Sequence, residues 1–108
     1  MDEKVTEQSM QLILHAGTGR SMVMEAVKDL LKTGDVDAAR KKIEDAGKEI
    51  GEAHNIQTAL MSAECDGKEV EKSILLIHAQ DHFMSALVVR DMGQLMVSMY
   101  ETMCKNNK

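Results

Sequence analysis

The stretch that decides the fold is ILLIHAQDHFMSALVV, residues 74–89. Its first four residues are all apolar and together span more than one turn of a helix, so they cannot share a single stripe. A helix that is apolar on nearly all sides must be buried on nearly all sides. Because two partner helices within one chain cannot cover such a helix, we expect it to form the contact between parallel copies of the chain around a symmetry axis.

Two turn signals divide the rest of the sequence into long segments. Thr33-Gly34-Asp35 combines a glycine suited to closing one helix with an aspartate suited to capping the next. Asp66-Gly67 ends the middle segment by the same chemistry. Apolar residues recur in each segment at spacings of three and four, as in an amphipathic helix. Since short connections make neighbouring helices antiparallel, we expect one all-α domain, residues 1–108, folded as an up-down-up three-helix bundle.

Two further features of these segments bear on packing. One apolar seam of the last segment consists of Val70, Ile74, Ile77, Asp81, Met84, Val88 and Leu95. Four glycines lie inside helical segments, where each costs roughly 1 kcal/mol relative to alanine; they are Gly17, Gly19, Gly47 and Gly51. Gly17 and Gly19 mark either a kink or a close approach of another backbone or a partner, and Gly47 and Gly51 favour tight helix packing; the alternative is that the surrounding packing merely tolerates them.

Composition narrows the classes of function. There is no proline, and Phe83 and Tyr100 are the only aromatic residues, which argues against a small all-β domain and against stacking on bases or sugars. With 13 Lys and Arg against 18 Asp and Glu, the formal charge of −5 leaves no positive surplus for nucleic acid. The polar N-terminal stretch and the absence of a long apolar run predict a cytoplasmic protein with no direct membrane insertion.

The most apolar part of the chain also carries three ionisable groups within five residues, His78-Ala79-Gln80-Asp81-His82. His78, Asp81 and His82 are three and four positions apart, so a helix presents them within one arc of about 100°. Burying ionisable groups in an apolar interface costs free energy, so their presence here indicates a chemical role. They suit a metal-binding bundle or metalloenzyme. Equally, one imidazole suits the role of a nucleophile that accepts a phosphoryl group, and a purely structural helical trimer is the third interpretation.

Three segments resemble one known family. His78-Ala79-Gln80-Asp81-His82-Phe83-Met84 resembles the HAQDHLM motif of the lactose/cellobiose-type enzyme IIA proteins of the bacterial phosphotransferase system. Residues 53–58, AHNIQT, are similar to the family's AHxxQT segment, and Ala16-Gly17 with Arg20-Ser21 is similar to its AGxxRS segment. The chain departs from the family at Thr18-Gly19 and at Phe83, and neither departure touches the histidine.

The resemblance implies a three-helix protomer that assembles into a homotrimer, a nine-helix bundle. It implies that His78 receives a phosphoryl group from phospho-HPr and passes it to a cysteine of the cognate enzyme IIB during disaccharide uptake. Lactose, cellobiose and chitobiose systems share this type of carrier. It further implies that three symmetry copies of Asp81 meet near the trimer axis and share a divalent cation, Mg²⁺ by preference. Such a cation would relieve the repulsion between carboxylates there; the alternative is that burial keeps Asp81 protonated.

Other polar residues near these motifs receive less specific predictions. His82, one turn beyond His78, either donates to the phosphoryl oxygens, orients His78 or simply packs in the interface. Gln80 points about 200° away from His78, so we expect any role of Gln80 across a subunit boundary. His54 and Gln57 share a helix face and either line the site or satisfy a buried polar contact, and His15 is expected to be structural or exposed.

Overall fold

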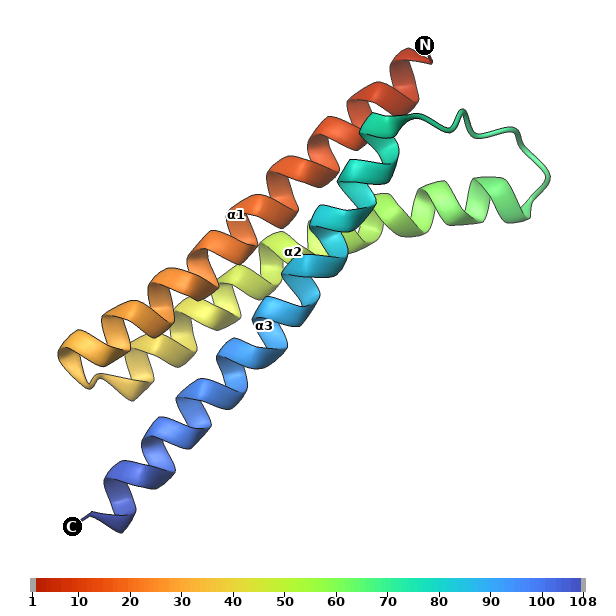
Figure 1. Ribbon diagram of the computed structural model, residues 1–108. Helices are drawn as coiled ribbons and strands as arrows, with labels where there is room; N and C mark the ends of the chain where they lie inside the picture. The colour runs from red at the N-terminus through yellow and green to blue at the C-terminus, as the bar shows by residue number, and fades with distance from the viewer. Residues whose placement is uncertain (1, 108) are drawn as a thin grey trace.

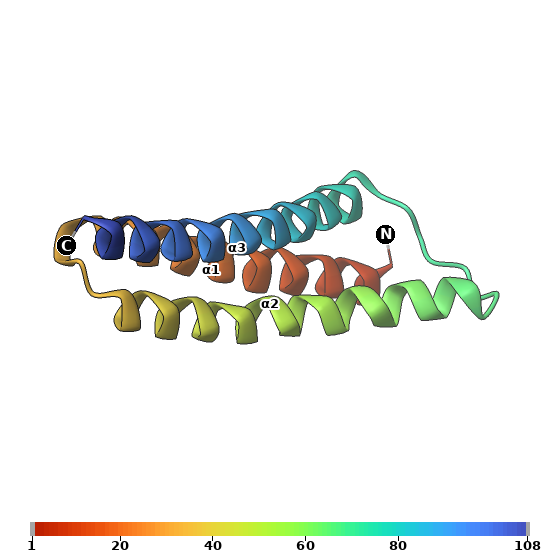
Figure 2. The same cartoon turned by 90° about the horizontal axis from the view of Figure 1, so that it is seen from below.

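The computed structural model describes residues 2–107 and shows, within them, three α-helices and no strand (Figure 1). Helix α1 spans Glu3–Thr33, α2 spans Val36–Cys65 and α3 spans Ile74–Asn106. Consecutive helices run antiparallel, so the predicted up-down-up three-helix bundle is confirmed (Figures 1 and 2). The bundle measures 59 × 21 × 19 Å.

The first turn signal acts as the sequence predicts. Gly34 closes α1 in the left-handed conformation, with φ 73°, and its N–H donates to the carbonyl oxygen of Leu30 at 2.8 Å. Asp35 then caps α2, because its carboxylate accepts a hydrogen bond from the N–H of Ala38 at 3.0 Å. Residues 34 and 35 are therefore the whole connection between two antiparallel helices.

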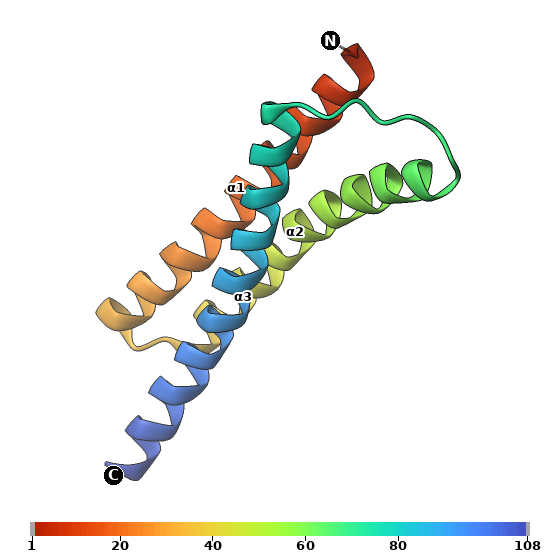
Figure 3. The ribbon, with the colours of Figure 1, turned by 45° about the vertical axis from the view of Figure 1, so that its right-hand side comes forward.

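The second turn signal ends α2, but α3 begins later than the apolar seam suggests. Gly67 takes a positive φ of 84°, and residues 68–73 are not helical. This connection returns to the start of α3 beside the N-terminal part of α1, while the end of α2 diverges from α3 (Figures 1 and 3). Helix α3 starts after Ser73, whose hydroxyl accepts a hydrogen bond from the N–H of Leu76 at 3.0 Å.

Val70 is thus wrongly placed on a helical seam by the sequence pattern. In the structure it lies in the connection and packs against a small cluster of buried residues from all three helices, Val5, Leu60 and Leu76. The connection has polar contacts of its own, since the carboxylate of Glu71 accepts a hydrogen bond from the N–H of Asp2 at 2.8 Å. These tertiary contacts override the local periodicity at this position.

The core of the bundle is built largely from small side chains. One cluster of buried residues contains Leu12, Ala16, Ile50, Ala53, Ala79, Phe83 and Ala86. A second contains Val23, Ala26, Leu30, Ala39, Ile43, Ala46 and Val97. Phe83 is the largest of the fully buried side chains, and alanines from every helix surround it in the first cluster.

Of the four glycines that the sequence singles out, Gly19 alone lies at a close approach. A Cβ atom added there would lie 2.5 Å from Cγ1 of Ile50 and 3.1 Å from the carbonyl oxygen of Ala46. The same addition at the other three would meet nothing within 4 Å. Gly93, which the sequence pattern does not mark, makes a second close approach in α3, against Val23.

The substitution Gly19→Ala is expected to destabilise the protein by about 1–3 kcal/mol, because the α2 backbone cannot yield to the added methyl group. Gly47→Ala is the matched control: nothing lies near its added Cβ, so the better helix propensity of alanine should stabilise the protein by up to about 1 kcal/mol. Urea unfolding midpoints measure both effects. Shifts of the same sign and size in the two variants would contradict the close packing at Gly19.

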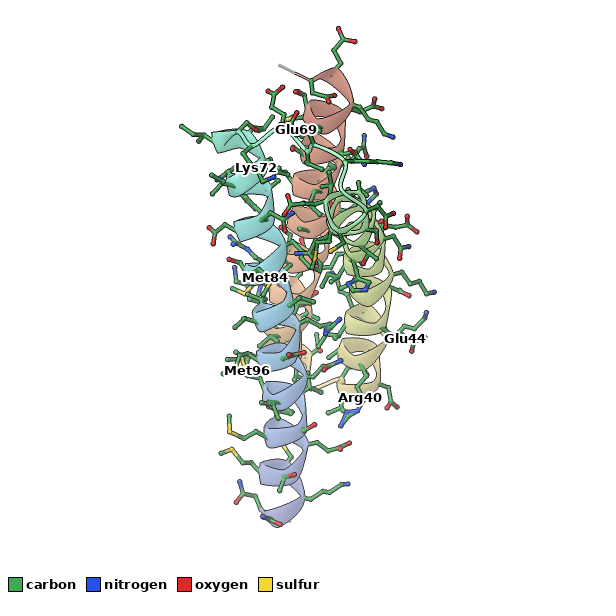
Figure 4. All side chains as sticks on the ribbon, turned by 90° about the vertical axis from the view of Figure 1, so that its right-hand side faces the viewer. Arg40, Glu44, Glu69, Lys72, Met84 and Met96 are labelled. Atoms are coloured by element: carbon green, nitrogen blue, oxygen red, sulfur yellow. The ribbon has the colours of Figure 1, made fainter. Side chains whose placement is uncertain are left out.

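One face of α3 is left uncovered by α1 and α2. We call it the α3 apolar stripe; it consists of the exposed side chains Ile74, Ile77, Met84, Val88, Leu95 and Met99. Figure 4 shows Met84 projecting from α3 on the side away from α2, with Met96 further along the helix. No helix in the part of the chain described here combines the length and the apolar character needed to cross a membrane.

Candidate functional site

Two imidazoles from consecutive turns of α3 meet on its surface. The Nε2 atoms of His78 and His82 are 3.0 Å apart, within hydrogen-bond distance. Their ring centroids are 4.5 Å apart, and the ring planes stand nearly perpendicular at 79°. The spacing of four residues predicts that these two rings share a helix face, and the structure confirms it.

The two rings differ in their surroundings. His78 is exposed, whereas His82 is only partly exposed. Nδ1 of His82 is buried and has no hydrogen-bond partner among the described residues. The pair therefore consists of an exposed ring that is open to a partner molecule and a second ring that is held with one edge in the protein.

Asp81 is exposed and lies between Ile77 and Met84 along the α3 apolar stripe, as the predicted seam requires. In residues 2–107 no group of three or more His, Cys, Asp and Glu side chains is arranged to hold a metal ion. The alternative prediction of a metal site built by one chain from His78, Asp81 and His82 therefore finds no support.

Gln80 has its partner within its own chain. Its side-chain oxygen accepts a hydrogen bond at 2.7 Å from Nε2 of Gln57, on α2. The contact is partly buried and ties α2 to α3. A single sequence shows that Gln57 shares a face with His54 but not which residue of α3 faces it, so this partner was not predicted.

The three segments that resemble the family motifs meet around one part of the core. Ala16, Ala53 and Ala79, one from each segment, belong to the same buried cluster as Phe83. The ring of His54 is tilted by 37° against that of Phe83, with centroids 6.1 Å apart. The three segments thus pack together in one part of the core, next to the turn of α3 that carries His78.

His15 lies in a different contact. Its Nδ1 is 2.8 Å from Oε2 of Glu49, which joins α1 to α2 through a partly buried hydrogen bond. This contact agrees with the structural role expected for His15. Its acidic partner on α2 was not predicted, because spacing within one segment gives no information about the register of two helices.

Comparison with known proteins gives consistent results over nearly the whole chain. The family model described as "PTS system, Lactose/Cellobiose specific IIA subunit" matches residues 7–101. The lichenan-specific phosphotransferase enzyme IIA component of Bacillus subtilis is 44% identical over 101 residues, covering 94% of this chain and 91% of that protein.

Solved structures agree with this fold. The cellobiose-specific enzyme IIA from Bacillus anthracis superposes with a TM-score of 0.88 at 37% identity, covering 95% of this chain and 94% of its own. The IIA component in a solution structure of the IIA(chitobiose)–HPr complex gives a TM-score of 0.80 at 28% identity, with coverage of 94% and 98%. These similarities extend over whole protomers and are not limited to single motifs.

Proposed function

Because the chain belongs to the lactose/cellobiose-specific IIA family of the phosphotransferase system, we propose that His78 is the side chain that carries its phosphoryl group. The protein is a phosphotransferase component of that system. His78 accepts the group from phospho-HPr and passes it to a cysteine of the cognate enzyme IIB, in the uptake of a disaccharide of the lactose, cellobiose or chitobiose class. The protein carries out these steps in the cytoplasm.

The observation that carries this proposal is the exposed imidazole of His78 beside a second imidazole at 3.0 Å. Phosphoryl transfer demands little covalent chemistry of the protein beyond a positioned nucleophile and groups that stabilise charge on the transferring oxygens. An exposed ring on a rigid helix supplies the first, and the neighbouring ring supplies a hydrogen-bond donor. The relative solved together with HPr supports the assignment of the phosphoryl donor.

The proposal is tested with labelled phosphoenolpyruvate, the general phosphotransferase proteins and the purified chain. We expect one acid-labile phosphoryl group per chain, since phosphohistidine is hydrolysed by acid whereas phosphoserine is not. The label should then pass to a IIB protein of the same family of systems. The proposal is contradicted if this chain acquires no label while a IIA protein of known activity is labelled in parallel.

We also propose that the protein acts as a homotrimer held together by the α3 apolar stripe. Large exposed apolar patches on a monomer are typical of interaction surfaces. Here Ile74, Val88 and Leu95 are 86%, 61% and 63% exposed, which is unusual for side chains of this kind. Parallel copies of α3 around a threefold axis would cover this stripe on each chain at once.

A trimer of this kind would bring together three copies of Asp81. Because each chain offers one exposed carboxylate within an apolar stripe, three copies at an axis form an all-oxygen donor set, which Mg²⁺ prefers. The residues present therefore fit a shared divalent cation. When bound, that cation would neutralise the carboxylates and so stabilise the assembly.

The substitution Asp81→Leu is expected to preserve the trimer and to abolish its dependence on divalent cations, because it removes the repulsion that the cation relieves. Light scattering with and without a chelator measures this. Chelation should promote dissociation of the wild-type trimer and leave Asp81→Leu and the uncharged, similarly shaped Asp81→Asn unaffected. If chelation changes neither the wild type nor the variants, the cation has no structural role.

A further inference from the structure

The histidine pair has two possible arrangements of its protons. Because the Nε2 atoms of His78 and His82 are 3.0 Å apart, one of them carries a hydrogen and the other a lone pair when both rings are neutral. If Nε2 of His78 donates, the hydrogen of His82 is on its Nδ1. If Nε2 of His82 donates, the hydrogen of His78 is on Nδ1 and its Nε2 lone pair accepts.

The buried edge of His82 distinguishes these arrangements. Nδ1 of His82 is buried without a partner among the described residues. An orphaned buried N–H is rarer and less tolerated than an acceptor with an unused lone pair. The arrangement that leaves only a lone pair on this nitrogen is therefore favoured, and in it His82 is the donor of the shared hydrogen bond.

We infer that His82 is a catalytic hydrogen-bond donor. Its Nε2–H first donates to the Nε2 lone pair of His78 and, once His78 carries the phosphoryl group, donates to a phosphoryl oxygen. This inference rests on the proposed function and deepens it. In the resting state the lone pair of His78 is occupied by this hydrogen bond, and its Nδ1 carries a proton. The resting pair thus keeps the ring in one tautomer, with Nε2 as the nucleophilic atom.

The rings have to separate before a phosphorus atom can reach Nε2 of His78, because 3.0 Å leaves no room for it between the two nitrogens. His78 is the exposed ring and His82 the one with a buried edge, so His78 rotates while His82 stays in place. After that rotation the Nε2–H of His82 points at the space where the phosphoryl oxygens of a phosphorylated His78 lie.

Phosphoryl transfer to His78 exchanges one bond to phosphorus for another. The Nε2 lone pair of His78 forms the new nitrogen–phosphorus bond as the bond from phosphorus to the donor's leaving atom breaks, and the electron pair of that bond stays with the donor. The His78 ring then carries a positive charge, which it loses by releasing the Nδ1 proton to water. His82 neither gains nor loses a proton; its N–H changes acceptor, from the His78 nitrogen to a phosphoryl oxygen.

Nitrogen NMR of the unphosphorylated protein at alkaline pH, where imidazoles are neutral, tests the tautomers. We expect a protonated Nδ1 and an unprotonated Nε2 for His78, and the opposite for His82. In the variant His82→Ala, His78 should lose its preference for the Nδ1–H tautomer and show averaged tautomers. In the control His15→Gln, which removes a histidine outside the site, His78 should keep that preference. Signals that place the protons on Nε2 of His78 and Nδ1 of His82 would overturn the inference.

Single-turnover labelling tests the role of the donor in transfer. Removing one preorganised donor to a transition-state oxygen slows reactions by about a hundredfold or more. We therefore expect the substitution His82→Ala to lower the rate constant of phosphoryl transfer about a hundredfold. The concentration of phosphoryl donor that gives half the maximal rate should not change. His82→Gln, whose amide N–H can replace the donor, should recover most of this loss. Circular dichroism confirms that each variant is folded.

The two proposals fail in different ways. If the wild type is not labelled, or is labelled elsewhere than on His78, the proposed function fails. If His78 is labelled and His82→Ala, folded, is labelled at the wild-type rate, only the role of His82 fails. Equal losses in His82→Ala and His82→Gln would likewise overturn it, because a packing role, and not a donor, would then explain the effect.

Discussion

The substitution His78→Ala is expected to yield a folded chain that accepts no phosphoryl group. His78 is exposed and belongs to none of the three buried clusters, so its loss leaves the core intact. No other imidazole can replace it. His82 has one edge buried, His15 is engaged with Glu49, and His54 lies on another helix against Phe83.

We expect the rate of label incorporation to fall by at least about a thousandfold, as when a covalent nucleophile is removed from other enzymes. Acid-labile label per chain, followed over time, measures it. The control is His15→Ala, which also removes one imidazole but lies outside the site and should be labelled like the wild type. Label in His78→Ala at the wild-type level would show that another residue is the acceptor.

The substitution Val88→Glu is expected to convert the trimer into monomers without unfolding the chain. Val88 is 61% exposed in the single chain, so a glutamate there is solvated and leaves the core unchanged. In a trimer built on the α3 apolar stripe, three such carboxylates would be buried near one another without counter-ions. An unpaired buried charge costs several kcal/mol, so we expect a loss of about 3 kcal/mol per chain.

Light scattering or sedimentation over a range of concentrations measures the effect. The matched control is Gln94→Glu, which adds the same charge to the same helix about 120° away from Val88. Gln94 is exposed and lies beside Arg40 and Ile43 of α2, away from the stripe. The control should remain trimeric. A Val88→Glu chain that stays trimeric at micromolar concentration would show that the interface lies on another surface.

The parts of the fold that depend on local chemistry were predictable from the sequence. Gly34 forms the α1–α2 turn through its left-handed backbone conformation and Asp35 through its capping carboxylate, and both act as the pattern indicates. The start of α3 was less predictable. Val70 continues the helical spacing, yet contacts with residues far away in the sequence hold it in a non-helical connection.

The same distinction holds for the candidate site. The pairing of His78 with His82 follows from a spacing of four within one helix. The contact of Gln57 with Gln80 depends on the register between α2 and α3, which core packing sets and which no spacing within a segment reveals. The burial of Nδ1 of His82, from which its proton position follows, is likewise visible only in three dimensions.

The unequal lengths of the two connections have a consequence for the order of folding. Residues 34 and 35 join α1 to α2, whereas residues 66–73 join α2 to α3. Closing the shorter loop costs less chain entropy, so the α1–α2 hairpin should form early and α3 should dock onto it afterwards. The most apolar helix of the chain would then be the last to find its place. During that interval it is free to meet other copies of itself, so assembly competes with folding.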